Sequence, residues 1–191
     1  MADDMTIQPH EAVDVENATK PQFTIYRARD AKDVDGELMP YEGLNDVDTA
    51  GIAAAGEAGV GEGAVVKLLF SDPLSGMSLT YAWLKANYQL PRHSHNADCA
   101  YYIVSGEAHL GTEVLKAGDG FFVPKDGLYV YQAGPEGVEV VEFRTASEFH
   151  IKFSGNSARF WSRMAAISSA NLDQWRDGPT PPTARRYAGE A

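Results

Sequence analysis

The chain has 191 residues, of which 44% are hydrophobic, and a formal net charge of −11. This length suits one domain with a full core plus tails. Residues 1–62 hold 14 acidic and 4 basic side chains, a net of −10, so most of the acidity lies in the N-terminal third. Nucleic acids and anionic membranes are not attracted to such a surface, which argues against both as partners.

The sequence also bears on the compartment. It contains no run of 18 apolar residues, and the segment that follows Met1 lacks the positive region and apolar stretch of a secretory signal. The single cysteine, Cys99, cannot form an intramolecular disulfide and fits a reducing compartment. We therefore expect a cytoplasmic protein.

The first third of the chain predicts little regular structure. Residues 1–20 are polar and acidic without apolar periodicity, which is typical of a disordered arm. Phe23-Thr24-Ile25-Tyr26 alternates apolar and polar side chains and predicts a short strand. Residues 43–63 are rich in Gly, Ala and acidic residues, so within 21–63 we expect a long mobile connection with one helical turn.

From Ala64 onward the sequence changes to short β-rich runs that are separated by Gly or Pro. Such spacing is typical of an all-β barrel or sandwich, and we expect the barrel over residues 64–153. The expected strands are 65–70, 77–88, 93–95, 98–104, 108–110, 113–115, 120–123, 128–132 and 138–144, with an edge strand at 148–153. Turns at 105–107 and 133–137 are expected among the connections.

The last part of the chain predicts one helix within residues 154–175. Asn156 or Ser157 is a suitable N-cap, and Phe160, Met164 and Ile167 share one face of a helix that runs to about Ser168. We expect that face to pack on the outside of the barrel. Residues 176–191, which contain Arg185-Arg186 and three prolines, indicate a tail.

The most informative motif is His93-Ser94-His95. In an extended segment, side chains at i and i+2 leave the same face, so both imidazoles can reach a single ion. The spacing therefore favours a metal site.

The residues that follow resemble the cupin family. Its first motif is Gly, five residues, His-x-His, three or four residues, Glu, six residues, Gly. Here His93, His95 and Gly106 agree with it, whereas Asn87 stands at the first Gly and Cys99 at the Glu.

The second cupin motif, Gly, five residues, Pro-x-Gly, two residues, His, three residues, Asn, is matched by Gly118 and Pro124. The turn after Pro124 is one residue longer than in the motif, so its Gly is Gly127. The His then falls on Tyr129 or Val130, and the Asn on Ala133 or Gly134. The resemblance covers roughly residues 64–145.

The resemblance implies a fold and an assembly. The fold is all-β, a cupin-type double-stranded β-helix, or jelly-roll barrel, to which this chain adds one C-terminal helix and an extended N-terminal arm. It also implies a homodimer that forms through the N-terminal strand or the outer sheet, and a small-molecule ligand inside the barrel.

The resemblance also implies a divalent metal: Fe, Mn, Zn, Ni or Cu. His93, His95 and Cys99 are the candidate ligands, because a thiolate at the carboxylate position would bind strongly. If a β-bulge reverses which side chains of this strand point into the barrel, Asp98 replaces Cys99 as the candidate ligand. Both Tyr129 and Tyr101 are candidate catalytic residues that face the ligand. Four aromatic residues either line the interior or fill the core: Tyr81, Trp83, Phe122 and Phe143.

Three functions remain open from the sequence. The first is a metal-dependent enzyme that resembles small dioxygenases such as dihydroxyacetophenone dioxygenase. The second is a metal-free cupin that binds a small molecule. The third is an isomerase or lyase acting on a sugar or hydroxy acid, in which His and Tyr perform acid and base catalysis.

Overall fold

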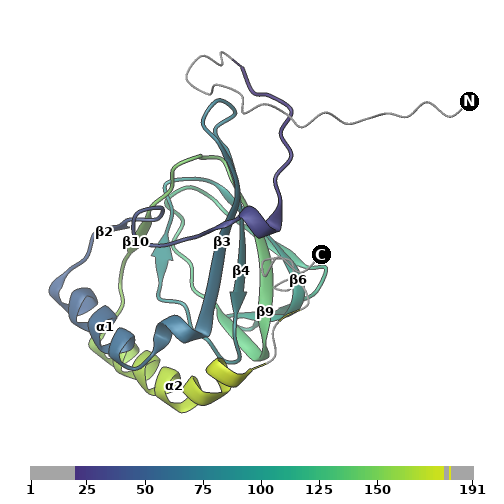
Figure 1. Cartoon of the computed structure of the whole chain (residues 1–191). Helices are drawn as coiled ribbons and strands as arrows, with labels where there is room; N and C mark the ends of the chain where they lie inside the picture. Colours follow the sequence, from purple (N-terminus) through teal and green to yellow (C-terminus); the bar gives the residue numbers. More distant parts are fainter. Residues whose placement is uncertain (1–19, 179–180, 182–191) are drawn as a thin grey trace, which may run out of the picture.

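A computed structural model of the chain describes residues 20–178 and Pro181. The expected arm therefore lies almost wholly outside the described residues, and so does most of the expected tail. Within the described part the strands form two sheets, one large and one of three strands. Figure 1 shows both sheets above a pair of helices.

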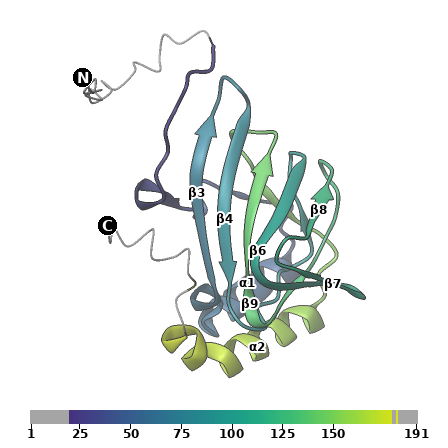
Figure 2. The same cartoon turned by 90° about the vertical axis from the view of Figure 1, so that its right-hand side faces the viewer.

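The large sheet is antiparallel, and its main path runs β1-β3-β4-β9-β6-β7, with β8 paired to β6. Its strands are β1 (Lys32–Asp33), β3 (Ala64–Asp72), β4 (Met77–Leu84), β9 (Gln132–Arg144), β6 (Cys99–Leu110), β7 (Glu113–Lys116) and β8 (Gly120–Val123). Figure 2 shows β3, β4, β9 and β6 side by side. These central strands supply most of the buried apolar side chains of the core.

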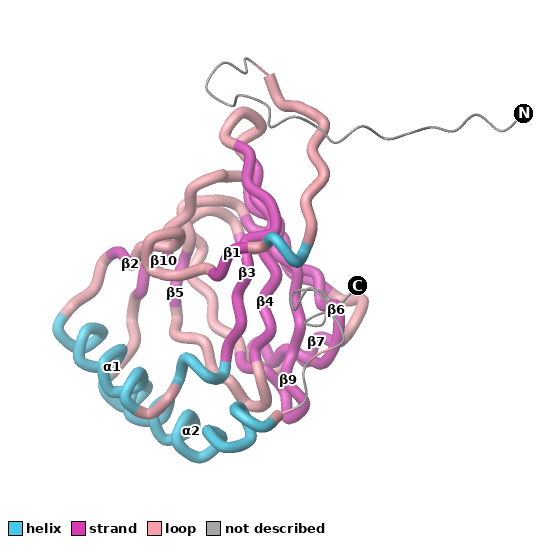
Figure 3. Tube along the Cα trace, in the orientation of Figure 1, coloured by secondary structure: helices cyan, strands magenta, loops and turns pink. Residues whose placement is uncertain are grey.

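The small sheet has the order β2-β10-β5, with bounds Tyr41–Glu42, Ile151–Phe153 and His93–Ser94. It lies across from the large sheet in Figure 3. An isolated antiparallel β-bridge joins His93 of the small sheet to Tyr129, which lies shortly before β9 of the large sheet. Two facing sheets of this kind, followed by a C-terminal helix, confirm the predicted all-β jelly-roll class.

The C-terminal helix, α2 (Ala158–Asp177), is confirmed and is longer than predicted. Its N-cap is Ser157, whose hydroxyl accepts a hydrogen bond from the Phe160 amide at 3.2 Å. Met164 of the predicted apolar face is buried, and the helix extends nine residues beyond Ser168 to bury Trp175 as well. The indole of Trp175 donates to the Ala86 carbonyl at 2.9 Å, which fixes the last turns of the helix against the sheet.

A second helix, α1 (Asp46–Glu57), occupies the region predicted as a mobile connection, so that prediction is wrong. The Asn45 side chain caps it by accepting from the Asp48 amide at 2.9 Å. The many small residues have a packing reason rather than a flexible one: a Cβ at Gly51 would overlap the Trp161 ring of α2. Small side chains let the two helices approach closely, and a short 3₁₀ turn (Val60–Gly63) then leads into β3.

Phe23–Tyr26 forms no strand, although its alternation predicted one. Phe23 is 88% exposed. An alternating segment becomes a strand only where a sheet edge is free to pair with it. Here β1, which follows a 3₁₀ turn at Ala28–Asp30, pairs with the edge of β3 instead.

The predicted turns at 105–107 and 133–137 are also wrong, because β6 and β9 run through them. Register shifts lie on both sides of Gly106: the extra residue is in β6 before it, and the extra residues are in β9, at 134–137, after it. Gly106 has φ +73°, and a Cβ there would collide with the Gly137 backbone. The glycines therefore permit a bulge and a close approach rather than a chain reversal.

Two of the four aromatic residues expected inside the barrel lie on its outer surface. Phe122 is 64% exposed and Phe143 is 47% exposed, and both are register partners of Ala100 on the outer face of the large sheet. Tyr81 and Trp83 also belong to that face, because their register partners Val141 and Glu139 alternate with the inward-facing Glu142. The predicted position inside the barrel is therefore wrong, although Tyr81 is 2% exposed and is buried in the core as the alternative expected.

Candidate functional site

Three neighbouring strands place polar side chains in one row on the inner face of the large sheet. The register aligns Thr80 of β4, Glu142 of β9 and Tyr101 of β6. Directly opposed residues on adjacent strands share a face, so their side chains meet. The Thr80 hydroxyl donates to Glu142 Oε2 at 3.2 Å, and the Tyr101 hydroxyl donates to Glu142 Oε1 at 2.5 Å.

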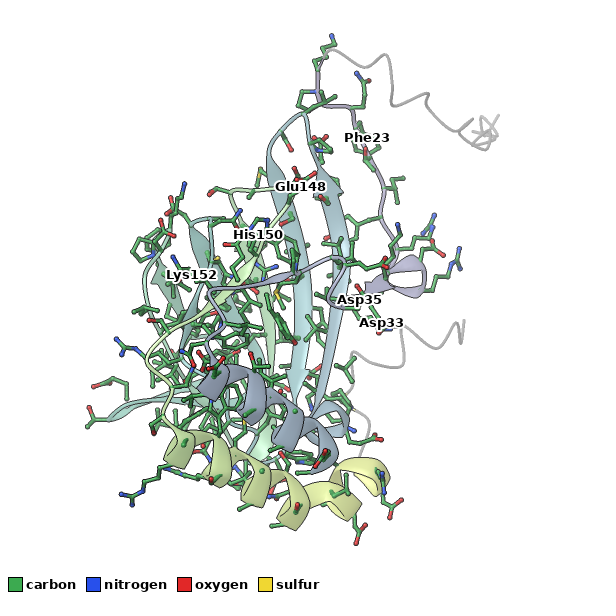
Figure 4. All side chains as sticks on the ribbon, turned by 90° about the vertical axis from the view of Figure 1, so that its left-hand side faces the viewer. Phe23, Asp33, Asp35, Glu148, His150 and Lys152 are labelled. Atoms are coloured by element: carbon green, nitrogen blue, oxygen red, sulfur yellow. The ribbon has the colours of Figure 1, made fainter. Side chains whose placement is uncertain are left out.

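The two histidines of the motif are buried and held in a fixed orientation. His93 Nδ1 lies 2.7 Å from the Pro91 carbonyl oxygen, and His95 Nδ1 lies 2.7 Å from that of His150. A carbonyl oxygen only accepts, so each Nδ1 carries the proton and each Nε2 keeps a free lone pair. The His150 side chain pairs with Glu42, and Figure 4 shows His150 and Lys152 along this segment.

Both Nε2 atoms face one phenol hydroxyl, that of Tyr129. The distances from this oxygen are 2.8 Å to His93 and 3.2 Å to His95. The same oxygen lies 2.5 Å from the Tyr101 hydroxyl. Tyr129 has a single proton and can donate to only one imidazole, so one Nε2 lone pair receives no proton within this cluster.

Arg144 completes the cluster on the far side of Glu142. Its Nε and Nη2 donate to the two carboxylate oxygens at 2.9 and 2.6 Å, a bidentate pair between two buried side chains. The guanidinium carbon lies 3.8 Å from the centre of the Phe149 ring. The remaining nitrogen, Nη1, is buried and has no hydrogen-bond partner.

Burial and charge fix the protonation states of these groups. Burial lowers the pKa of His93 to about 3, and His95 adds to this shift. Burial also lowers the pKa of His95, while the Glu142 charge opposes that shift. Burial raises the pKa of Tyr101 and of Tyr129 well above the ordinary value, so both phenols stay protonated.

Glu142 is the ionised acid of the cluster. Burial by itself raises the pKa of its carboxyl group, but Arg144 and then His95 outweigh burial and hold it below its ordinary value. The cluster therefore contains one ion pair, Glu142 with Arg144, among neutral imidazoles and phenols.

The structure brings together all five predicted site residues: His93, His95, Tyr101 and Tyr129 meet through their polar atoms, and Cys99 is the register partner of Arg144, with its thiol beside Glu142 and Arg144. Cys99 lies at the start of β6 in the apolar core, where its thiol donates to the Ala97 carbonyl at 3.5 Å. Burial raises the pKa of Cys99 to about 12, so its sulfur stays a thiol. Asp98, its alternative, accepts from the Lys125 amide at 2.7 Å instead.

Sequence reasoning missed Glu142 and Arg144, although a signal for both was present. In β9, Val138 and Val140 are buried, and the next two residues of the same parity are Glu142 and Arg144. Two charged residues that continue an apolar inward row predict a buried ion pair.

The nitrogen and oxygen atoms of this cluster do not form a family-type metal centre. Among residues 20–178, no three His, Cys, Asp or Glu side chains are grouped so that they could hold a metal ion. The point between the two Nε2 atoms is taken by the Tyr129 phenol, which keeps its proton. Arg144 binds both oxygens of Glu142, the carboxylate of the cluster, so these oxygens are not free to bind a cation.

Comparison with known proteins finds likenesses in structure alone. No protein-family model matches the sequence, and no curated protein matches it. An RmlC-like cupin from Shewanella frigidimarina is 25% identical with a TM-score of 0.38, over 44% of this chain and 76% of that one.

Two further solved structures are also similar. The polyketide cyclase RemF from Streptomyces resistomycificus is 18% identical with a TM-score of 0.46, over 58% of this chain and 84% of that one. KdgF from Halomonas sp. is 19% identical with a TM-score of 0.39, over 44% and 79%.

The chain has a cupin-type fold. The facing sheets, the paired histidines and the positions of Gly106, Gly118 and Pro124 carry that assignment. Within the described part of this cupin-type chain, no helix is both long enough and apolar enough to cross a membrane.

Proposed function

We propose that the interior of the barrel is an acid–base site for a small organic substrate, of the isomerase or lyase type. The observation that carries the proposal is the convergence of two proton-free Nε2 atoms on one phenol hydroxyl. Paired proton acceptors and proton donors in a buried cluster are the groups that move a proton between substrate atoms.

His95 is the proposed proton acceptor. Its Nε2 lies 4.0 Å from Glu142 Oε1, so the carboxylate stabilises the imidazolium that forms when His95 takes a proton from the substrate. For His93, burial and the neighbouring His95 outweigh the Glu142 charge and lower its pKa to about 3. Its Nε2 lies 2.8 Å from the Tyr129 hydroxyl, so its proposed role is to orient that phenol.

Tyr129 and Tyr101 are the proposed donors to the oxygen on which negative charge develops. Both phenols are protonated and lie within 2.5 Å of each other. Fixed O–H donors in a site shielded from water stabilise a developing oxyanion strongly. A substrate oxygen beside His95 would then meet the base on one side and, on the other, the two phenols once their protons turn to it from His93 and from Glu142.

Metal dependence, with dioxygenase-like chemistry, is the competing proposal from the motif. The two proton-free Nε2 atoms favour it, whereas the absence of a third ligand among residues 20–178 and the binding of Glu142 by Arg144 oppose it. Elemental analysis after incubation with Fe, Mn, Zn, Ni and Cu separates the two. The acid–base proposal expects no stoichiometric metal, and metal that is retained by the wild type and lost in His93→Ala would favour the competitor.

The direct test follows proton exchange in D2O by NMR, with chelator-treated protein and a panel of small aldoses, 2-oxo acids and 2-hydroxy acids. We expect loss of the C–H signal next to a carbonyl or hydroxyl carbon. His95→Gln and Tyr129→Phe should slow the exchange about 10²–10⁴-fold, the usual contribution of a general acid or base. His109→Gln is the matched control, because His109 pairs with Glu107 outside the cluster.

Three outcomes would overturn the acid–base proposal: exchange that requires an added metal or dioxygen, exchange in His95→Gln at the wild-type rate, and no exchange with any compound of the panel.

A further inference from the structure

The interior cluster contains a buried cationic donor that nothing in the described chain satisfies. Arg144 is 4% exposed, and its Nη1 has no hydrogen-bond partner. Nearly all buried donors in folded proteins are paired, and leaving a charged one unpaired is costly. An acceptor that is not part of the described chain is therefore expected at this nitrogen.

The chemistry of the missing acceptor follows from how the rest of Arg144 is used. One edge of the guanidinium, Nε and Nη2, binds Glu142, Phe149 covers one face, and the Cys99 thiol also interacts with this side chain. The two N–H bonds of Nη1 remain, and a carboxylate oxygen is the partner that such donors bind most strongly. Glu142 and Arg144 cancel each other's charge, so an incoming carboxylate meets no uncompensated negative charge.

The other end of the cluster lacks a donor. When Tyr129 donates to His93, the nearer imidazole, the Nε2 lone pair of His95 is left without a proton. A substrate hydroxyl would supply that proton. Glu142 Oε1 links the two ends, because it lies 4.0 Å from His95 Nε2 and 2.9 Å from Arg144 Nε. Nη1 lies away from the edge that Glu142 binds, so a ligand that reaches both ends must extend past this carboxylate.

We propose that the substrate is a small hydroxy acid whose carboxylate accepts from Arg144 Nη1 and whose hydroxyl donates to His95 Nε2. This inference rests on the proposed acid–base function and narrows its substrate class from a sugar or hydroxy acid to the acid. A neutral sugar offers hydroxyl donors to His95 but no charged acceptor to Arg144.

The experiment measures binding rather than turnover. Lactate, mandelate and 3-hydroxybutyrate are titrated calorimetrically into the chelator-treated protein, each beside its own amide, which has the same shape without the charge. We expect each acid to bind at least about tenfold more tightly than its amide, which corresponds to one charge-assisted hydrogen bond.

Arg144→Lys keeps the positive charge beside Glu142 but has only one nitrogen, so it should reduce the ratio of acid to amide affinity toward one. Arg92→Lys is the matched control, because Arg92 is exposed and lies outside the cluster, and it should leave the ratio unchanged. Far-ultraviolet circular dichroism of both variants checks that each is folded.

Equal affinity for acids and amides, an undiminished ratio in Arg144→Lys, or no binding of any acid would overturn the inference. Its failure is distinguishable from that of the proposed function. Acids that bind as expected but show no proton exchange support the substrate class and overturn the acid–base reaction. Proton exchange on neutral carbonyl compounds, without tighter binding of acids, supports the acid–base reaction and overturns the substrate class.

Discussion

Two buried carboxylates on the same strand, Glu139 and Glu142 of β9, lie on opposite faces of the large sheet and are stabilised in different ways. Glu139 is 2% exposed and accepts from the hydroxyls of Tyr81 and Ser105, both at 2.6 Å. Glu142 is 6% exposed and is held by the Arg144 cation. On the outer face neutral hydroxyls stabilise the carboxylate by hydrogen bonds, whereas on the inner face a second buried charge stabilises it.

The difference separates a structural acid from a candidate functional one. A cavity of about 250 Å³ lies beside Glu139, lined among others by Trp83, Lys85 and Trp175. The Lys85 ammonium bonds to the Trp175 carbonyl and lies 5.0 Å from the centre of the Trp83 ring. Lys85 and Glu139, which both line this cavity, thus already have partners, whereas the inner cluster leaves Arg144 Nη1 unpartnered and one histidine without a proton to accept.

The largest expected effect comes from breaking the inner ion pair. Arg144→Met leaves the Glu142 charge buried without its cation, and removing one partner of such a pair usually costs about 3–5 kcal/mol of folding free energy. We expect a loss of this size in the free energy of unfolding, measured by urea denaturation.

The double variant Glu142→Gln/Arg144→Met is the matched control for this prediction. It removes both charges and should recover most of the lost stability, because no lone charge remains buried. A double variant as unstable as Arg144→Met would show that shape, and not charge, dominates this side of the sheet.

The pH dependence of stability provides a second test, which concerns the buried His93. His93 has a pKa near 3 in the folded state, against about 6.5 in an unfolded chain. The unfolded state then binds more protons, so stability should fall as the pH decreases from about 6.5 toward 3, by up to about 1.4 kcal/mol per pH unit.

Denaturation series at several pH values test this contribution. His93→Gln should flatten the slope, because it removes the group whose pKa differs between the folded and unfolded states. A slope that is unchanged in His93→Gln would assign the acid sensitivity to other groups.

The residues of the inner cluster differ in how far the sequence predicted them. The motif spacing identified His93, His95 and Tyr129 correctly as neighbours. The alternation of side chains along a strand and the spacing of the cupin motifs can both be read from short stretches of sequence. Glu142 and Arg144 were missed because pairing across strands, which brings Glu142 to Tyr101, depends on a register that local pattern does not define.

Other errors have the same origin in tertiary contacts. Glycine predicts a turn from sequence, but Gly106 forms a bulge because Gly137 lies against it. Gly51 suggested a loop and instead lets α1 pack on Trp161. Cys99 has the spacing of a ligand and the parity of an inward residue, yet its surroundings make it part of the core. Residue type and spacing predicted on which side of a strand or helix these residues lie, whereas their structural roles depend on tertiary packing.

The smallest expected effect tests the outer acid. Glu139→Gln retains an oxygen that accepts from one of the two hydroxyls, and the other hydroxyl can rotate to accept from the new amide group. The exchange of hydrogen bonds to a carboxylate for neutral ones should cost only about 1 kcal/mol in the free energy of unfolding. The hydroxy-acid preference should be unchanged, because Glu139 lies on the opposite face of β9 from Arg144. A loss as large as that of Arg144→Met would mean that the outer acid also serves a buried cation, and the contrast between the two faces would then fail.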